Sequence, residues 1–144
     1  MAVRAVYLGL GSNLGARKTN IRRALKLLRE KVAIIKVSSF YLTKPVGYAD
    51  QPDFINAAAE IKTALSPLRL LRLLKSIEKK IGRQKTFRNG PRVIDIDILL
   101  YEGRAIRTKQ LTIPHPQIDR RDFVLRPLRE IAPTLDKKVY RWKK

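Results

Sequence analysis

One stretch of the chain, Val93 to Tyr101, constrains the fold more than any other. It follows a Gly-Pro break and is rich in β-branched and large apolar residues, which predicts a strand covered on both faces of a sheet. Two carboxylates, Asp95 and Asp97, nevertheless lie within it. Residues i and i+2 of a strand point to the same face about 7 Å apart, so the two acids share a face. Such a pair needs a nearby cation, which could be Arg, Lys or a divalent metal.

The composition predicts a single domain over residues 1–144 with a strongly basic surface. The length allows a hydrophobic core, and no stretch approaches the length of a membrane span. The absence of cysteine excludes disulfides, thiolate metal sites and cysteine nucleophiles. The net charge of +20 attracts polyanions such as nucleic acid or a nucleotide triphosphate. Without a membrane span or cysteine, we expect a cytoplasmic enzyme that is a monomer and has no membrane partner. Because the charge is scattered and no long polybasic tail is present, we expect no specific nucleic-acid partner, although non-specific polyanion binding is compatible with this charge.

Hydrophobic patterning predicts alternating strands and helices. We expect strands at Arg4–Leu10, Ala33–Leu42 and Val93–Tyr101, helices at Arg17–Arg29 and from Ser66-Pro67 to Gly82, and a last helical segment from Arg120 that is broken or restarted at Pro127. Phe54–Lys62 is ambiguous because its three alanines favour a helix. Gly9, Gly11 and Gly15 match no dinucleotide or Walker spacing, so we interpret them as tight-turn glycines. The end at Lys137–Lys144 is expected to be a short strand or a frayed tail.

Cationic residues cluster directly before the two acids, at Arg83, Lys85, Arg88 and Arg92. They could grip phosphate groups, or they could belong to a flexible surface loop. His115, the only histidine, is held between two prolines, which favours a positioned donor over the structural role that a lone histidine usually has. The lysines and arginines along the helix that starts at Ser66-Pro67 are most simply a solvated face.

Six stretches of the chain together resemble one family, the 6-hydroxymethyl-7,8-dihydropterin pyrophosphokinases of folate biosynthesis. In chain order they are Leu10–Gly15, Ser38–Thr43, Gln51–Ala58, Gly90–Leu100, Ile113–Pro116 and Arg121–Pro133. The resemblance implies a ferredoxin-like α+β sandwich with helices packed on a mostly antiparallel sheet, in which the alanine-rich segment after Asn56 is a strand. It also implies an enzyme that transfers pyrophosphate from ATP to the hydroxymethyl oxygen of the pterin, leaving AMP.

The resemblance also implies roles for individual residues. Asp95 and Asp97 would bind two Mg²⁺ ions with ATP, as suits a hard cation that prefers carboxylate and phosphate oxygens. Together with Arg83 and Arg92 they form the expected catalytic set. The expected ATP contacts are Arg83, Arg92, His115 and Arg121 at the triphosphate, Leu71, Ile98, Leu111 and Thr112 around the adenosine, and Glu78 beside them.

On the pterin side, Phe54 and Phe123 would sandwich the ring, as offset aromatic stacking on a flat heterocycle allows. Asn56 would hydrogen-bond the amide-like edge of the pterin with its donor and acceptor together. Backbone groups near Thr43 and Val46 would contribute to the same site.

Two other interpretations remain open at this point. The first is an RNA-binding module, because sandwich folds with basic faces commonly bind RNA. The aromatic residues of this chain, however, do not gather in one strand motif. The second is a homologue without activity, which would be expected to have lost an aspartate or a pterin contact. A structural salt bridge between Arg92 and the aspartates is the corresponding alternative to the metal site.

Overall fold

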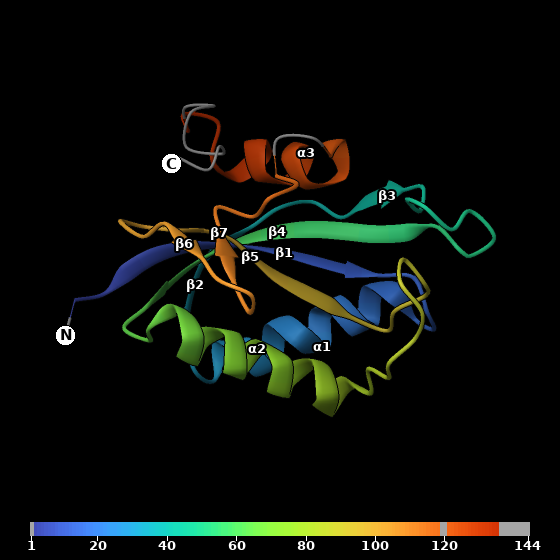
Figure 1. Ribbon diagram of the computed structural model, residues 1–144, viewed down its shortest axis with the longest axis horizontal. Helices are drawn as coiled ribbons and strands as arrows, with labels where there is room; N and C mark the ends of the chain where they lie inside the picture. Colours follow the sequence, from blue (N-terminus) through green and yellow to red (C-terminus); the bar gives the residue numbers. More distant parts are fainter. Residues whose placement is uncertain (1, 119–120, 136–144) are drawn as a thin grey trace.

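The computed structural model describes residues 2–118 and 121–135, so the predicted tail at Lys137–Lys144 lies outside the described residues, as does Arg120. Its centre is a five-stranded sheet in the order β2-β4-β1-β5, with β3 also paired to β4 (Figure 1). The strands are β1 (Arg4–Ser12), β2 (Ala33–Val37), β3 (Tyr41–Thr43), β4 (Phe54–Thr63) and β5 (Asp95–Tyr101). All of these pairings are antiparallel. A separate two-stranded sheet joins β6 (Ile106–Arg107) to β7 (Thr112–Ile113).

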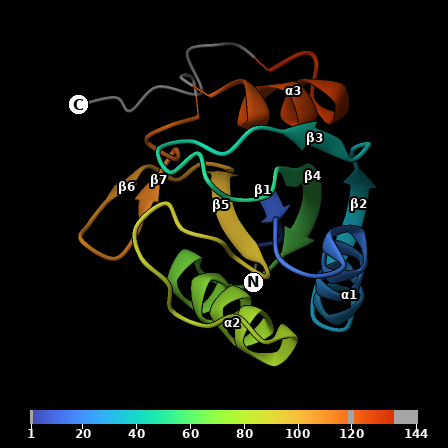
Figure 2. The same cartoon turned by 90° about the vertical axis from the view of Figure 1, so that its right-hand side faces the viewer.

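Helices cover both faces of the main sheet. Helices α1 (Arg17–Arg29) and α2 (Pro67–Ile81) pack on one face, and α3 (Asp122–Ile131) packs on the other (Figures 1 and 2). The order β1-α1-β2-β4-α2-β5 with this strand arrangement is the predicted ferredoxin-like α+β sandwich, to which α3 adds a third layer. Among the described residues, no helix is both long and apolar enough to cross the bilayer.

Alternation along the central strands decides which side chains face which helices. Val6, Leu8 and Leu10 of β1 are buried in the core under α1 and α2. The intervening positions of a strand point to the opposite face, so Gly9 and Gly11 lie on the face that carries α3. Their partners on β5 are Asp97 and Asp95, respectively. The sheet therefore places the two acids next to two residues without side chains.

Both predicted long helices are confirmed, and the ambiguous segment is a strand. Ser66 caps α2 by accepting a hydrogen bond from the Arg69 amide, and Gly82 ends it with a left-handed φ of 110°. The alanines at 57–59 are buried in β4, where the strand pairs on both sides and packs under α3. Burial in the centre of the sheet thus outweighs the helix propensity of alanine.

The predicted single strand at Ala33–Leu42 is wrong, because it breaks into β2 and β3 around Ser38. The Ser38 amide donates to the Ala58 carbonyl, and the Ala58 amide donates to Ser38 Oγ (both 2.8 Å), so a side chain replaces one ladder bond. The next residue, Ser39, donates from both its amide and its hydroxyl to Glu130 on α3. These bonds turn the chain between the two short strands.

Three further boundaries differ from the sequence predictions. Strand β5 begins at Asp95 because the Val93 carbonyl accepts from the Asn20 side chain instead of a neighbouring strand. Strand β1 continues to Ser12, so Gly9 and Gly11 are strand residues and only Gly15, with a φ of 71°, is a turn glycine. Helix α3 runs without a break through Pro127, which removes one intrahelical amide donor and is buried against the sheet.

Candidate active site

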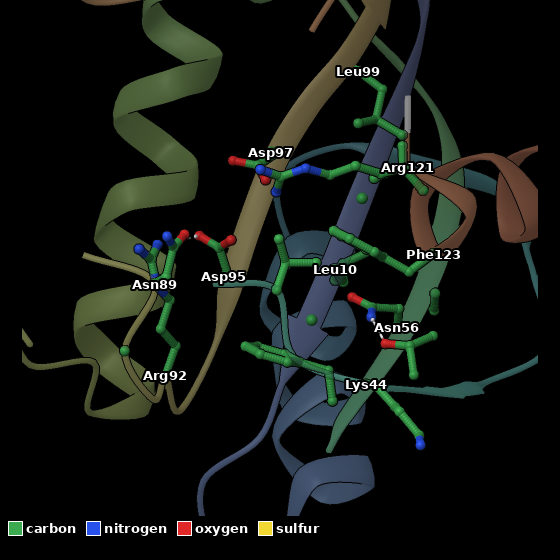
Figure 3. Close-up of a pocket in the computed structure, with 18 residues that line it drawn as sticks. Leu10, Lys44, Asn56, Asn89, Arg92, Asp95, Asp97, Leu99, Arg121 and Phe123 are labelled. Carbon is green, nitrogen blue, oxygen red and sulfur yellow. Dashed lines mark hydrogen bonds and ion pairs between the residues drawn. The ribbon is translucent and has the colours of Figure 1, made fainter. Parts of the chain in front are cut away.

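A cavity opens on the α3 side of the sheet, over the ends of β4, β1 and β5 (Figure 3). The strands contribute Gly9, Leu10, Gly11, Thr43, Phe54, Asn56, Ala57, Asp95, Asp97 and Leu99 to its lining, the two neighbouring loops contribute Lys44, Val46, Asn89, Gly90 and Arg92, and the α3 end contributes Arg121, Phe123 and Val124. All five predicted pterin contacts are in this set. The structure therefore brings them together with both aspartates, Arg92 and Arg121.

Glycines form part of the cavity floor. A Cβ atom on Gly11 would lie only 2.6 Å from Asn56 Oδ1 and 3.6 Å from the Phe54 ring. A Cβ on Gly9 would lie 3.4–3.6 Å from the Leu99 side chain, which is an ordinary contact. Glycine at position 11 is therefore required by the Asn56 amide, and this requirement replaces the tight-turn interpretation made from the sequence.

The Asn56 amide is fixed by its neighbour on β3. Its Nδ2 donates to Thr43 Oγ1 at 2.6 Å, and Thr43 is held in place because β3 pairs with β4. This bond leaves the Asn56 carbonyl oxygen as an acceptor in a half-buried position. A flat ligand with an N–H group at its edge would satisfy that acceptor.

Two aromatic rings line the same cavity from different elements. Phe54 begins β4, and Phe123 lies in the first turn of α3. Both rings are only partly buried, so each keeps a surface for a ligand. The Arg121 guanidinium lies 5.5 Å from the centre of the Phe123 ring, and in Figure 3 this guanidinium extends toward Asp97. An anionic group on a stacked ligand would therefore meet Arg121.

Asp95 is neutralised by two arginines. Its Oδ1 accepts from Arg83 Nη1 at 2.9 Å and from Arg92 Nη1 at 3.4 Å. The salt bridge to Arg92 that the sequence left open is therefore present for Asp95. Asp97 is different, because among the described residues no Lys or Arg lies within salt-bridge distance of it.

The Asp97 carboxyl holds its proton unusually tightly. Desolvation, followed by the negative charges of Asp95 and Glu78, raises the pKa of Asp97 to about 7, and Lys75 and Arg92 only partly offset this. Its side chain is still 46% exposed, so a cation can reach it from the cavity. The like-charge repulsion expected from the sequence is thus concentrated on Asp97.

Glu78 lies behind this site and does not line the cavity. It is 2% exposed, and its Oε2 accepts from Arg83 Nη1 at 2.6 Å and from the Ile96 amide at 2.8 Å. Ile96 separates the two aspartates on β5, so Glu78 fixes both the strand and the arginine beside Asp95. Its observed contacts are those of a positioning residue.

His115 lies next to Asp97, with 4.0 Å between Nε2 and the nearer carboxyl oxygen. Its Nδ1 accepts from the Gln117 amide at 3.2 Å, which in the neutral ring places the proton on Nε2. Desolvation and the nearby Arg121 lower the pKa of His115. A neutral imidazole with its N–H directed at the acidic pair suits the positioned donor predicted from the sequence.

The residues predicted around the adenosine do not gather at the cavity. Ile98 and Leu111 are buried in the core under α1 and α2, and Leu71 packs against that core. Thr112 is half-buried in β7. A second cavity, lined by Glu78, Arg83 and Arg92 with further basic residues of α2 and the following loop, shares Arg92 with the first. Its cationic walls are compatible with a polyphosphate.

Sequence reasoning missed two amides that join the loops around the cavity. Asn13, 1% exposed, donates to Gln51 Oε1 and the Pro52 carbonyl and accepts from the Arg92 amide at 2.8 Å. Gln51 in turn donates to the Asn89 carbonyl at 2.7 Å. These bonds connect residues far apart in the chain, and nothing in the local pattern around Asn13 or Gln51 indicates them.

Comparison with known proteins identifies the family. A sequence model described as 7,8-dihydro-6-hydroxymethylpterin-pyrophosphokinase (HPPK) matches residues 7–133. The chain belongs to this family. The family predicted from the sequence is thereby confirmed.

Two bacterial relatives agree with this membership. The chain is 49% identical over 135 residues to the 2-amino-4-hydroxy-6-hydroxymethyldihydropteridine pyrophosphokinase of Bacillus subtilis, covering 92% of this chain and 81% of the relative. It is 47% identical over 136 residues to the enzyme of the same name from Aquifex aeolicus, covering 94% and 85%. A crystal structure of Plasmodium falciparum HPPK-DHPS superposes with a TM-score of 0.74 at 18% identity. It covers 96% of this chain but only 43% of that one, and at this identity it supports the fold alone.

Proposed function

We propose that this member of the HPPK family transfers pyrophosphate from ATP to 6-hydroxymethyl-7,8-dihydropterin, giving AMP and the pterin diphosphate. The observation that carries the proposal is the single cavity that joins Asn56, Phe54 and Phe123 to the acidic pair. In this reaction the hydroxymethyl oxygen forms a bond to the β-phosphorus of ATP. The bond between that phosphorus and the oxygen bridging to the α-phosphate breaks, AMP leaves with that oxygen, and the hydroxyl proton is released.

The donor set suits Mg²⁺. Asp95 and Asp97 present carboxylate oxygens to one cavity, and no group of three His, Cys, Asp or Glu residues that could hold a metal occurs among the described residues. Mg²⁺ usually takes one or two carboxylates and completes its shell with phosphate oxygens and water. We propose that these two aspartates hold Mg²⁺, as many as two ions, together with the triphosphate. Bound there, the metal would neutralise charge that develops on the transferred phosphoryl group.

The remaining residues bind and orient the substrates. Phe54 and Phe123 would stack on the pterin ring. Asn56, oriented by Thr43, would hydrogen-bond the edge of the pterin, and backbone groups near Val46 would complete the contact. Arg92 and Arg121 reach the cavity and would bind phosphate oxygens. Arg83 and His115 flank the acidic pair and would do the same once the triphosphate is present.

The adenosine is proposed to lie on the α2 side of β5. There Leu71, Ile98, Leu111 and Thr112 would contact it, with Glu78 behind them. Because these side chains are largely packed in the structure, this assignment rests on the family resemblance. We also propose a monomer, since one chain supplies every residue of the cavity, and a cytoplasmic location, where ATP is available.

The direct test is an incubation of the protein with ATP, Mg²⁺ and the pterin, followed by quantification of AMP. The matched control is Asp97→Asn, which keeps the shape of the side chain and removes its charge. We expect AMP formation that depends on the pterin and falls by more than about a hundredfold in the variant. AMP at the level of the Asp97→Asn control would refute the proposed activity.

A further inference from the structure

The outer surface of helices α1 and α2 is almost purely cationic. Its exposed basic residues are Lys18, Arg22, Arg23, Lys26 and Arg29 on α1 and Arg69, Arg72, Lys75, Lys79 and Lys80 on α2. We call this set the basic helical face. The only acid within the two helices is Glu78, which is buried, and the nearest exposed one is Glu30 directly after α1.

These charges are not compensated within the protein. Among the described residues, Lys75 is the one member of the basic helical face with a carboxylate in salt-bridge range, Glu78 at 3.4 Å. Several members are four residues apart on one helix, such as Lys18, Arg22 and Lys26, and like charges at this spacing repel and destabilise the helix. A ligand that supplies negative charge along both helices would relieve this repulsion.

The arrangement of the charges matches a phosphate backbone. Helix α1 has 13 residues and α2 has 15, so each cationic row is roughly 20 Å long at about 1.5 Å per residue. The two helices contact each other and form one layer on the sheet (Figures 1 and 2). They therefore present two adjacent rows of positive charge, each long enough to meet several phosphates of a strand.

Other polyanionic partners fit this surface less well. No exposed position of α1 or α2 carries an aromatic side chain, so single-stranded bases would find no stacking platform. The exposed large apolar side chain of the two helices is Leu68 alone, whereas membrane-surface helices bury an apolar face. The cavity that holds the acidic pair lies on the opposite face of the sheet, beside α3, whereas the second cavity shares Lys75 and Lys79 with the basic helical face.

We propose that the basic helical face is a sequence-independent binding site for a nucleic-acid duplex, which it contacts through the phosphate backbone. Lys75 and Lys79 also line the second cavity, so a duplex that covers these two residues would compete with a polyphosphate bound there. This site does not rest on the proposed enzymatic function, and either can fail without the other.

The test measures binding of a short fluorescein-labelled RNA duplex by anisotropy over a series of salt concentrations. A face variant carries Lys18→Gln, Lys26→Gln, Arg69→Gln and Arg72→Gln. A control variant carries Lys36→Gln, Lys62→Gln, Arg104→Gln and Lys109→Gln, four exposed residues outside α1 and α2, so the two variants have equal net charge. Circular dichroism tests whether the face variant and the control variant remain folded.

We expect the slope of log K against log salt to become less steep by about 3 to 4 in the face variant and by less than about 1 in the control variant. We also expect the duplex to raise the melting temperature of the unaltered protein. Equal losses in the two variants would overturn the proposal, because net charge alone would then explain binding. Tighter binding of single-stranded RNA, or binding only of anionic vesicles, would overturn it as well.

Discussion

Replacing Gly11 with alanine should damage the proposed pterin side of the cavity while leaving the fold in place. The new Cβ atom would lie 2.6 Å from Asn56 Oδ1, which is too close for two non-bonded atoms. The amide must therefore move, and its 2.6 Å hydrogen bond to Thr43 Oγ1 would be strained or lost. Asn56 would then present neither its donor nor its acceptor in the position that the cavity now provides.

The magnitude follows from the groups that are displaced. Overpacking costs about 1–3 kcal/mol, and the lost hydrogen bond adds about 1 kcal/mol. Removing a glycine from the interior of a strand returns about 0.5–1 kcal/mol. We therefore expect the free energy of unfolding to fall by about 1–3 kcal/mol. A ligand that loses the amide contacts should bind more weakly by about 2–3 kcal/mol, which corresponds to roughly 30- to 150-fold.

The matched control is Gly9→Ala, two residues earlier on the same face of β1. There the Cβ atom would meet only the flexible Leu99 side chain at 3.4–3.6 Å. Fluorescence titration with the pterin gives the affinity, and the side-chain amide signal of Asn56 in NMR reports whether its environment has changed. Gly11→Ala should shift that signal and bind the pterin more weakly than Gly9→Ala. If Gly11→Ala leaves the Asn56 signal and the pterin affinity unchanged, the role assigned to this glycine is wrong.

Three further perturbations test other parts of the site. Since the pKa of Asp97 is raised to about 7, Mg²⁺-dependent ATP binding should weaken by about tenfold per pH unit below that value, measured by calorimetry, and Asp97→Asn should lose this dependence. As the pH rises from 4 to 7, the protein without metal should lose stability relative to Asp97→Asn, because a raised carboxyl pKa penalises the ionised folded state. A difference in urea midpoints that stays constant over this pH range would contradict this. Glu78→Ala leaves the buried Ile96 amide without its acceptor and Arg83 with only Asp95 as a carboxylate partner, and it should lower stability by about 2–4 kcal/mol in urea unfolding, whereas Glu78→Gln, which keeps an acceptor, should cost less. Asn13→Ala removes three side-chain hydrogen bonds and should cost about 2–4 kcal/mol, with faster hydrogen exchange at the Arg92 amide as the local sign.

Features that depend on short-range periodicity could be predicted from the sequence. The two-residue period of a strand places Asp95 and Asp97 on one face, and the structure has both lining one cavity. The cap at Ser66 and the stop at Gly82 define α2 through local backbone chemistry alone. The strand at Phe54–Thr63 followed from the family resemblance, since alanine propensity favours the other outcome.

Features that depend on long-range contacts could not be predicted in this way. Ser38 breaks a strand because its hydroxyl accepts a hydrogen bond from the Ala58 amide. Gly11 is required because Asn56 lies opposite it on the neighbouring strand β4. Asn13 joins two loops through partners more than thirty residues away in the chain. A sequence lists such residues as ordinary polar or turn residues, and only the register of the sheet shows what they touch. The pairing of Asp95 with both Arg83 and Arg92 has the same origin.

The most direct test of the central claim is to follow the phosphorus atoms during the reaction. ATP labelled at its β-phosphorus is incubated with the protein, Mg²⁺ and the pterin, and the products are separated. Transfer of pyrophosphate predicts that the label appears in the pterin product and that the nucleotide product is unlabelled AMP. Labelled ADP would mean that only the γ-phosphoryl group is transferred or hydrolysed, and this result would contradict the account.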